Sequence, residues 1–332
     1  MNDNKILVTG AAGFIGSWVV KKLSERGFDV RAGVHNSYFE NKFIGIKNTE
    51  TVKIDILDKD SLKRAMKGVR TVYHFAASVK SNVPIGQLNK VNSEGTKNVW
   101  TCAAECGVNS ALYCSSAAVY GLLSYSDKPI NENIPARAIE PYGRSKLHGE
   151  TKALNVSVKA GLETVIVRPV AVFGPGEHTP FGLKLRDAAV SKILLAGNFR
   201  KKSFSFVHVE DVADACIYLM SEKLPGKNIY NITYNEPVLF EDAFRAYINA
   251  LDRSGRSYLR VKYLASLSAI AHKLPDFPLK LFKDKRNRFS FNLFQPGFEM
   301  IYSSEKLLNL SFKFKWNNFE DIIFSCINDK PV

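Results

Sequence analysis

The sequence predicts an α/β protein built on a doubly wound parallel sheet, with a smaller, interleaved C-terminal domain. Short apolar runs alternate along the first half of the chain with longer segments in which apolar residues recur at helical spacing. A glycine-rich turn joins the first apolar run to the first helical segment. Strands that alternate with helices in this way form parallel βαβ units, which place helices on both faces of one sheet.

Each element follows from its own pattern. The run Lys5-Ile-Leu-Val stops at Thr9-Gly10 and predicts a buried strand, and segment 14–26 has the apolar spacing of a helix. Further strands are expected at 28–34, 52–56, 71–76, 111–115 and 163–168, and further helices at 60–66, 91–106 and 142–160. After residue 169 the pattern loosens, and a helix at 206–220 and a strand at 228–233 return to the sheet. The predicted domains are 1–169 plus about 206–232, and 170–205 plus 233–332, with a cleft between them.

The composition is that of an ordinary globular protein, with 332 residues of which 45% are hydrophobic and 23% charged. Five cysteines without a CxxC pair predict free thiols in a reducing compartment, and the absence of a long apolar run adds to the expectation of a cytoplasmic protein. The net charge of +14 favours anionic partners. Residues 253–288 carry ten basic and two acidic groups. A solvated face is the favoured interpretation of this segment, and peripheral contact with an anionic membrane surface is the alternative.

The turn Thr9-Gly-Ala-Ala-Gly-Phe-Ile-Gly predicts a pyrophosphate site of the Rossmann type. A strand, a glycine turn and a helix N-terminus in this order let the backbone approach an anion, and the unpaired N–H groups and the helix dipole attract it. Three glycines alone are weak evidence, but their place between the first strand and the first helix makes them specific. The predicted cofactor-binding residues of this turn are Gly10, Ala12, Gly13, Phe14, Ile15 and Gly16.

The end of the second strand bears on the choice of dinucleotide. A carboxylate that binds the adenosine ribose is expected there, but the stretch Val30-Arg-Ala-Gly-Val-His-Asn has none. Arg31 and His35 are placed to meet a 2′-phosphate instead, so NADP is favoured over NAD, although a solvated Arg31 is the equally plausible alternative. Asp55 and Ile56, at the end of the third strand, are placed to contact the adenine.

Tyr142 and Lys146 form the second candidate site. At i and i+4 on a helix the two side chains share a face. A nearby ammonium stabilises a phenolate and lowers the tyrosine pKa, which makes Tyr142 a competent general acid or base. The same spacing occurs at Tyr38 and at Tyr258. Only the pair at Tyr142 lies on the helix expected to flank the cleft.

Together these residues resemble the extended branch of the short-chain dehydrogenase/reductase superfamily, the NAD-dependent epimerase/dehydratase type. The resemblance covers nearly the whole chain and rests on eight blocks in order. These are the glycine turn, Asp55-Ile, Tyr73-His-Phe-Ala-Ala, Val91-Asn-Ser-Glu-Gly-Thr-Lys-Asn, Cys114-Ser-Ser-Ala-Ala-Val-Tyr-Gly, Pro141-Tyr-Gly-Arg-Ser-Lys, Arg168-Pro-Val-Ala-Val-Phe-Gly-Pro-Gly and Phe206-Val-His-Val-Glu-Asp-Val-Ala.

The resemblance implies a role for each matching position. Tyr142 would exchange a proton with the substrate oxygen, Ser116 would hold that oxygen, and Lys146 would bind the nicotinamide ribose. Further cofactor contacts are implied for Ala76, Ala77, Pro169 and Val170. The second domain would bind the substrate, and a homodimer would form through the helices near 91–106 and 142–160.

Departures from the family pattern bear on the substrate. Similar sugar-nucleotide dehydratases have Asp-Glu where this chain has Ala117-Ala118, so 4,6-dehydration is not expected. Many sugar-nucleotide enzymes carry Asn at the position of Ala171, and an Arg that grips the substrate diphosphate at the position of Phe204. Arg200, Lys201 or Lys202 is the alternative cation for a diphosphate in this chain. The C-terminal stretch 263–282 looks like that of 3β-hydroxysteroid dehydrogenase-like and dihydroflavonol reductase-like members. The favoured function is an NAD(P)-dependent oxidoreductase that interconverts a secondary alcohol and a carbonyl on a small, fairly apolar molecule; a sugar-nucleotide epimerase or reductase is the alternative.

Other sites are not expected. The six histidines lack metal-ligand spacing, and His208 with Asp211 is interpreted as structural, so no metal is predicted. A nucleic-acid-binding protein on this fold is the different-class hypothesis that the basic charge suggests. The complete set of Ser116, Tyr142 and Lys146 argues against it, so no nucleic-acid partner is predicted.

Overall fold

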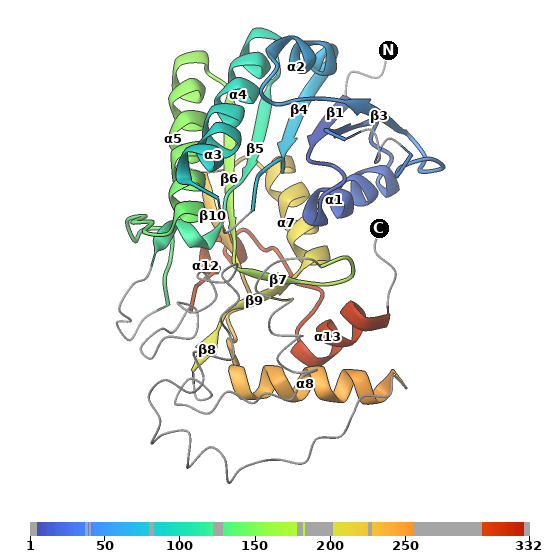
Figure 1. The fold of residues 1–332 in the computed structure, drawn as a ribbon, viewed down its shortest axis with the longest axis vertical. Helices are drawn as coiled ribbons and strands as arrows, with labels where there is room; N and C mark the ends of the chain where they lie inside the picture. The colour runs from blue at the N-terminus through green and yellow to red at the C-terminus, as the bar shows by residue number, and fades with distance from the viewer. Residues whose placement is uncertain are drawn as a thin grey trace.

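A seven-stranded parallel sheet forms the centre of the molecule (Figure 1). The computed structural model describes residues 5–36, 39, 41–79, 83–121, 129–177, 182, 202–224, 228–254 and 301–328. The strand order is β10-β6-β5-β4-β1-β2-β3, so the chain runs outward from β1 to β3, crosses back to β4 and continues to β10. The strands are β1 (Lys5–Thr9), β2 (Val30–Val34), β3 (Thr49–Lys53), β4 (Val69–His74), β5 (Ser110–Cys114), β6 (Glu163–Pro169) and β10 (Ile229–Ile232). This arrangement confirms the predicted doubly wound α/β sheet.

Helices cover both faces of this sheet, as Figure 1 shows. One face carries α1 (Phe14–Glu25) and α7 (Val209–Ser221), and the other carries α2 (Lys59–Met66), α4 (Thr96–Glu105) and α5 (Pro141–Ala160). Side chains of β1 alternate between the two cores: Ile6 and Val8 pack with the α1 and α7 side, whereas Leu7 packs with Trp100 of α4. Burial on both faces explains why the central strands are mostly apolar, whereas the edge strand β3, which contains Glu50 and Lys53, is partly exposed.

The single helix predicted at 91–106 is interrupted. It begins earlier, as α3 (Ile85–Asn89), continues through a π-helical segment (Lys90–Gly95) and ends as α4. At Gly95 a Cβ atom would lie 2.6 Å from Ile56 Cδ1, so this segment packs unusually close to the chain that follows β3. A π-helical turn cannot be predicted from apolar spacing, because it adds one residue to a turn without changing composition.

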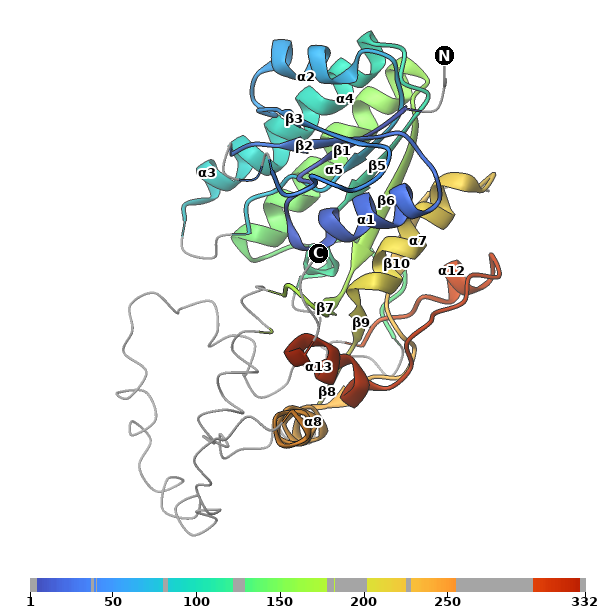
Figure 2. The ribbon, with the colours of Figure 1, turned by 90° about the vertical axis from the view of Figure 1, so that its right-hand side faces the viewer.

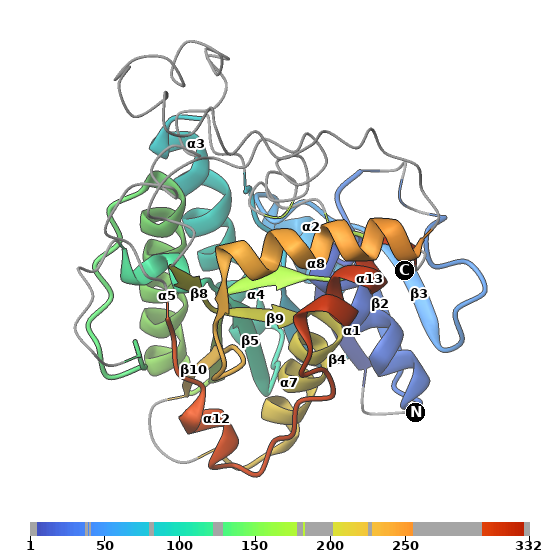
Figure 3. The same cartoon turned by 90° about the horizontal axis from the view of Figure 1, so that it is seen from below.

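A second, smaller region lies beyond the carboxyl ends of the main strands (Figure 2). It contains two two-stranded sheets, β7 (Ala171–Phe173) with β9 (Phe206–His208), and β8 (Ser203–Phe204) with β11 (Val238–Leu239). The helices of this region among the described residues are α8 (Phe240–Arg253) and α13 (Phe319–Asn328), and α12 (Glu305–Leu308) packs against β10 of the main sheet. Helices α8 and α13 pack side by side (Figure 3). An aromatic cluster of Phe173, Phe204, Phe206, Phe240 and Phe319 fills the space between these elements.

The helix predicted at 206–220 was wrong at its start. Residues 206–208 form strand β9, and α7 begins at Val209. Three residues are too few for an alternating pattern to emerge, and the apolar run continues into the helix without a break. The strand exists because β7 pairs with it, a contact between segments distant in the sequence.

A buried ion pair joins α5 to β6. Arg168 donates two hydrogen bonds to the Glu150 carboxylate, at 2.9 and 2.6 Å, and the two residues are 4% and 3% exposed. The guanidinium also lies 4.8 Å from the centre of the Tyr120 ring. Such a pair stabilises the fold only while both partners are present, because either charge alone is left buried without compensation.

Replacing Glu150 with Gln tests this contact. We expect the free energy of unfolding to fall by about 3–5 kcal/mol, because the Arg168 charge loses its partner in the core. Urea denaturation at pH 7 measures the change. The matched control is Glu105→Gln, which breaks the 2.7 Å Lys63–Glu105 ion pair at a position where both side chains are about half exposed. Exposed pairs contribute little, so this control keeps the stability of the unmodified protein. Equal stability of the two variants would contradict the assignment.

Candidate active site and dinucleotide cavity

The glycine turn between β1 and α1 fits closely against the end of β4. Gly10 has a φ of +68°, and a Cβ atom there would lie 2.5 Å from the backbone nitrogen of Ala76. At Gly16 a Cβ atom would lie 2.3 Å from the carbonyl oxygen of Gly10. Both positions therefore require glycine, the first for its backbone conformation and the second for the close approach of helix and turn.

The N-terminus of α1 is open to an anion. Within the described part of the chain, no side chain caps this helix, and its first turn carries no acidic residue. A cavity of about 800 Å³ lies beside it. The cavity is lined by Gly10, Ala12, Gly13, Phe14, Ser17, Gly33, Val34, His35, Asn36, Phe39, Lys42, Ile54, Asp55, Ile56, Leu57, Phe75, Ala76, Ala77, Val91, Pro175 and Gly176. This site suits a dinucleotide because it offers uncapped helix amides, glycines that let a ligand approach the backbone, and a mostly apolar wall.

The structure brings most of the predicted cofactor residues to this cavity. The lining includes Gly10, Ala12, Gly13, Phe14, His35, Asp55, Ile56, Ala76 and Ala77. Ile15 and Gly16 lie in the first turn of α1, and Pro169 and Val170 lie at the end of β6; the cavity wall does not include these four. Asp55 follows β3 rather than ending it, and its Oδ1 accepts a hydrogen bond from the Leu57 backbone at 2.9 Å.

Arg31 is not part of the cavity wall, so the structure does not place its side chain for the expected contact with a 2′-phosphate. Its guanidinium donates to Glu50 Oε1 at 2.6 Å and to the carbonyl oxygens of Ala65 and Lys67 at 2.6 and 3.0 Å. Arg31 pairs with Glu50 in the ladder between β2 and β3, so its side chain is held across the neighbouring strand. The Arg31 guanidinium is therefore bonded to other residues of the protein and is not part of the cavity lining.

Lys42 is a cavity residue that the sequence analysis did not select. It follows β2 in a loop, its Nζ donates to the carbonyl oxygen of Ala12 at 3.2 Å, and burial lowers its pKa. No carboxylate among the described residues raises that pKa. A cation held beside the glycine turn without a carboxylate partner is suited to a phosphate. Its position in the loop was the available signal, but spacing alone does not place a loop residue in space.

The catalytic candidates meet at the carboxyl end of β5. Ser116 is the N-cap of a short 3₁₀ helix (Ala117–Tyr120), and its Oγ accepts a hydrogen bond from the Ala118 backbone at 3.2 Å. Tyr142 lies in the first turn of α5. Burial raises the pKa of Tyr142 above its ordinary value, and the Ser116 side chain opposes that shift. The phenol is therefore protonated at neutral pH.

Lys146 lies one turn further along α5 and is 2% exposed. Burial lowers its pKa to about 8, and its Nζ lies 4.3 Å from the centre of the Tyr113 ring. The expected lowering of the Tyr142 pKa by Lys146 is not found: burial raises that pKa, and the contribution that opposes the rise comes from Ser116. Ser116, Tyr142 and Lys146 are not part of the cavity wall described above.

Asn92, which the sequence analysis did not select, ties three elements together behind this site. Its amide donates to Ser78 O and to Ser145 Oγ, each at 2.9 Å, and its Oδ1 accepts from the Ser78 backbone at 2.7 Å. Ser78 follows β4 and Ser145 lies on α5, so the π-helical segment links the two. The same contacts fix the position of α5 next to the cavity.

A buried chain of hydrogen bonds runs behind the glycine turn. Thr96 Oγ1 donates to the Asn92 carbonyl at 2.8 Å, so it accepts from His74 Nε2 at 3.0 Å. His74 Nδ1 therefore accepts from Thr9 Oγ1 at 2.6 Å, and Thr9 Oγ1 in turn accepts from the Ala76 backbone at 3.4 Å. The chain fixes His74 as the neutral Nε2–H tautomer, and burial lowers its pKa to about 3.

No group of three or more His, Cys, Asp or Glu side chains in the described ranges is arranged to hold a metal ion. A search of the same residues finds no helix with the length and apolar character needed to cross a membrane.

The fold and the cavity are those of a dinucleotide-dependent enzyme. Residues 6–233 match the NAD dependent epimerase/dehydratase family, and the chain belongs to that family. It is an NAD(P)-dependent oxidoreductase or epimerase of the extended short-chain type, which confirms the resemblance found in the sequence.

Individual relatives differ in what they act on. The chain is 31% identical to cinnamoyl-CoA reductase 1 from Oryza sativa over 68% of this chain and 70% of that protein. It is 34% identical to a putative UDP-glucose 4-epimerase from Methanocaldococcus jannaschii over 68% and 76%. Its fold matches the UDP-glucose 4-epimerase of Thermus thermophilus in complex with NAD with a TM-score of 0.74, at 22% identity over 98% of both chains.

The stability of the fold is expected to fall as the pH falls below about 6.5, the ordinary histidine pKa. His74 and His208 have pKa values lowered by burial to about 3 and about 4, so the unfolded chain binds protons that the folded chain does not. Each imidazole lowers the free energy of unfolding by up to about 1.4 kcal/mol per pH unit in this window. The His74→Asn variant lacks one of the imidazoles that bind a proton only in the unfolded chain. The free energy of unfolding of this variant, measured in urea, is therefore expected to fall less steeply between pH 6.5 and 4.5.

His148→Gln is the control for this measurement, since His148 is an exposed histidine of α5. The His148→Gln variant is expected to show the same dependence of the free energy of unfolding on pH as the unmodified protein. An unchanged slope in His74→Asn would show that His74 is protonated in the folded state.

Proposed function

We propose that this protein reduces the carbonyl group of a small, fairly apolar molecule to a secondary alcohol, and catalyses the reverse oxidation, with NADP as cofactor. The observation that carries the reaction is the placement of Tyr142 and Lys146 one turn apart on α5, with Ser116 at the carboxyl end of β5, where its side chain opposes the rise in the Tyr142 pKa. A nicotinamide dinucleotide, when bound, supplies or accepts the hydride.

The side chains divide the remaining chemistry. Tyr142 is a neutral phenol at pH 7, so it donates its proton to the carbonyl oxygen as that oxygen gains negative charge. Ser116 holds the same oxygen by a hydrogen bond and so stabilises the developing charge. Lys146 is buried beside them, binds the nicotinamide ribose and stabilises the tyrosinate left after proton transfer.

Phe204 carries the argument for an apolar substrate. It stands where many sugar-nucleotide enzymes have an arginine that grips a diphosphate, and it is 0% exposed, packed 4.7 Å from the ring centre of Phe240. A core aromatic residue cannot compensate a buried diphosphate. Similarity to cinnamoyl-CoA reductase supports net reduction of a carbonyl group. Similarity to a UDP-glucose 4-epimerase supports the alternative, a sugar-nucleotide epimerase or reductase.

The preference for NADP rests on Lys42 and His35, which line the cavity next to the end of β2. The two residues that directly follow β2 are His35 and Asn36, so a 2′-phosphate meets no carboxylate at these positions. Lys42 already lies against the glycine turn through Ala12 and donates its remaining protons without a carboxylate competitor among the described residues.

Three further proposals concern the surroundings of the enzyme. A homodimer through α4 and α5, a cytoplasmic location and contact of segment 253–288 with an anionic membrane stay predictions. Almost all of that basic segment lies outside the described residues.

Turnover with apolar ketones tests the proposed reaction. The purified protein, once denatured, is expected to release no tightly held nucleotide, and the native protein is expected to oxidise NADPH in the presence of a suitable ketone. Tyr142→Phe should lower kcat by at least about 100-fold, because the proton donor is lost, while NADPH binding is kept. Retained NAD that dialysis cannot remove would instead favour the epimerase, and unchanged turnover in Tyr142→Phe would refute the catalytic assignment.

Cofactor preference is tested by Lys42→Ala. Loss of a charge-assisted hydrogen bond to phosphate is expected to weaken NADPH binding about 10- to 100-fold and to leave NADH binding unchanged. Arg31→Ala is the matched control, because it removes a cation next to β2 that is bonded to Glu50 and not to the cavity. Calorimetric titration of both variants with both nucleotides measures the difference. A larger loss of NADPH affinity in Arg31→Ala than in Lys42→Ala would overturn the assignment.

A further inference from the structure

The turn that follows β7 forms one wall of the dinucleotide cavity. Pro175 and Gly176 line that cavity together with the glycine turn. The indole N–H of Trp18 donates to the carbonyl oxygen of Pro175 at 3.3 Å. Trp18 lies on α1, in the second turn of the helix that begins at Phe14. This buried hydrogen bond therefore connects the two walls of the cavity.

His208 packs against the same turn, at Gly174. Gly174 has a φ of +143°, and a Cβ atom there would lie 2.5 Å from Val209 Cγ1 and 3.1 Å from His208 Nε2. The turn thus rests directly on the end of β9 and the start of α7. The Trp18 and His208 rings meet edge to face with their centres 6.1 Å apart.

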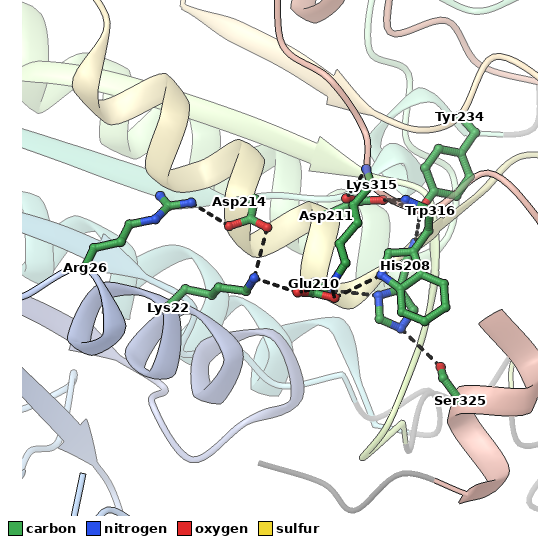
Figure 4. Close-up of polar contacts among 10 residues, drawn as sticks. All are labelled: Lys22, Arg26, His208, Glu210, Asp211, Asp214, Tyr234, Lys315, Trp316 and Ser325. Carbon is green, nitrogen blue, oxygen red and sulfur yellow. Dashed lines mark hydrogen bonds and ion pairs between the residues drawn. The ribbon is translucent and has the colours of Figure 1, made fainter. Parts of the chain in front are cut away.

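The orientation of the His208 ring is fixed on every side. Its Nδ1 accepts from the Glu210 backbone at 3.2 Å, so Nε2 carries the proton and donates to Ser325 Oγ at 3.2 Å. One face of the ring stacks on Trp316, with centres 4.2 Å apart. Figure 4 shows His208 between Trp316 and Ser325, both of which come from the C-terminal part of the chain. That part of the chain therefore holds the ring that supports the turn.

An ionic cluster fastens the C-terminal part at this point (Figure 4). Glu210 accepts from Lys22 at 2.6 Å, from Lys315 Nζ at 2.9 Å and from the Trp316 indole at 2.9 Å. Its neighbour Asp211 accepts from the Lys315 and Trp316 backbones at 2.8 and 3.0 Å. Helix α1, helix α7 and the C-terminal segment are thus joined beneath the cavity wall.

We infer that Trp18 and His208 are positioning residues for the cofactor: they hold the Gly174–Gly176 turn at the distance from the glycine turn that a dinucleotide needs. The inference rests on the proposed dinucleotide site. Neither side chain belongs to the cavity wall, so both act through the backbone of the turn. Their loss lets the turn move and raises the dissociation constant for the dinucleotide, while the reacting groups on α5 stay in place.

Cofactor binding and turnover in substituted full-length protein test this inference. Trp18→Phe keeps the ring and loses only the N–H, and it is expected to raise the dissociation constant for NADPH about five- to tenfold. His208→Ala is expected to do the same. His208→Gln should recover part of the affinity, because its side-chain amide can still donate to Ser325. With saturating NADPH, kcat of each variant should stay within about twofold of the unmodified protein.

Tyr218→Phe separates positioning from a general loss of stability. The Tyr218 hydroxyl donates to the Leu310 carbonyl and so also joins α7 to the C-terminal segment, but it does not contact the turn. It should lower stability and leave NADPH affinity unchanged. Dissociation constants within twofold of the unmodified protein in both Trp18→Phe and His208→Ala would overturn the assignment. If the unmodified protein binds neither NADPH nor NADH, the proposed function fails, and the assignment fails with it.

Discussion

The close approach of α5 to the main sheet is the constraint on which the active site depends. At Gly149 a Cβ atom would lie 2.3 Å from the Tyr113 hydroxyl, so a larger residue would push the helix away from β5. The next residue, Glu150, pairs with Arg168 of β6 in the core. One contact sets the distance between helix and sheet, and the other sets the position of the helix along the strand. The catalytic tyrosine and lysine lie within two turns on the same helix, so their positions follow from these two contacts.

The same burial that fixes α5 also determines its chemistry. Lys146 is buried and Tyr142 is half-buried, and burial disfavours the charged form of each: the pKa of the phenol rises and the pKa of the ammonium falls to about 8. The Tyr113 ring beneath Lys146 offsets part of the cost of burying the ammonium. A phenol that is protonated at neutral pH is consistent with the proposed role of Tyr142 as the proton donor.

The sequence predicted what local patterns determine. Short apolar runs gave the order of strands and helices, and the glycine turn and the Tyr142–Lys146 spacing gave the two candidate sites. The sequence-based prediction failed for features that depend on contacts between segments distant in the sequence. Arg31 is held by Glu50, its partner across the ladder between β2 and β3, and no local pattern in β2 shows which strand lies beside it. Strand β9 exists through its pairing with β7, and Lys42 enters the cavity through the path of a loop. These features follow from tertiary contacts rather than from spacing.

The interleaved order of the chain connects the two parts of the molecule through the cofactor cavity. After β6 the chain leaves the main sheet to form β7 and the turn at Pro175, returns through β9 and α7 to β10, and its C-terminal segment comes back to α7 and α1. The cavity is therefore closed by residues that follow β1, β2, β3, β4 and β7. The Trp18, His208 and Trp316 rings lie between these parts of the chain, with ring centres 6.1 and 4.2 Å apart. Because packed side chains transmit strain to their neighbours, we expect a change in how the smaller region packs to reach the Pro175 turn through these three rings.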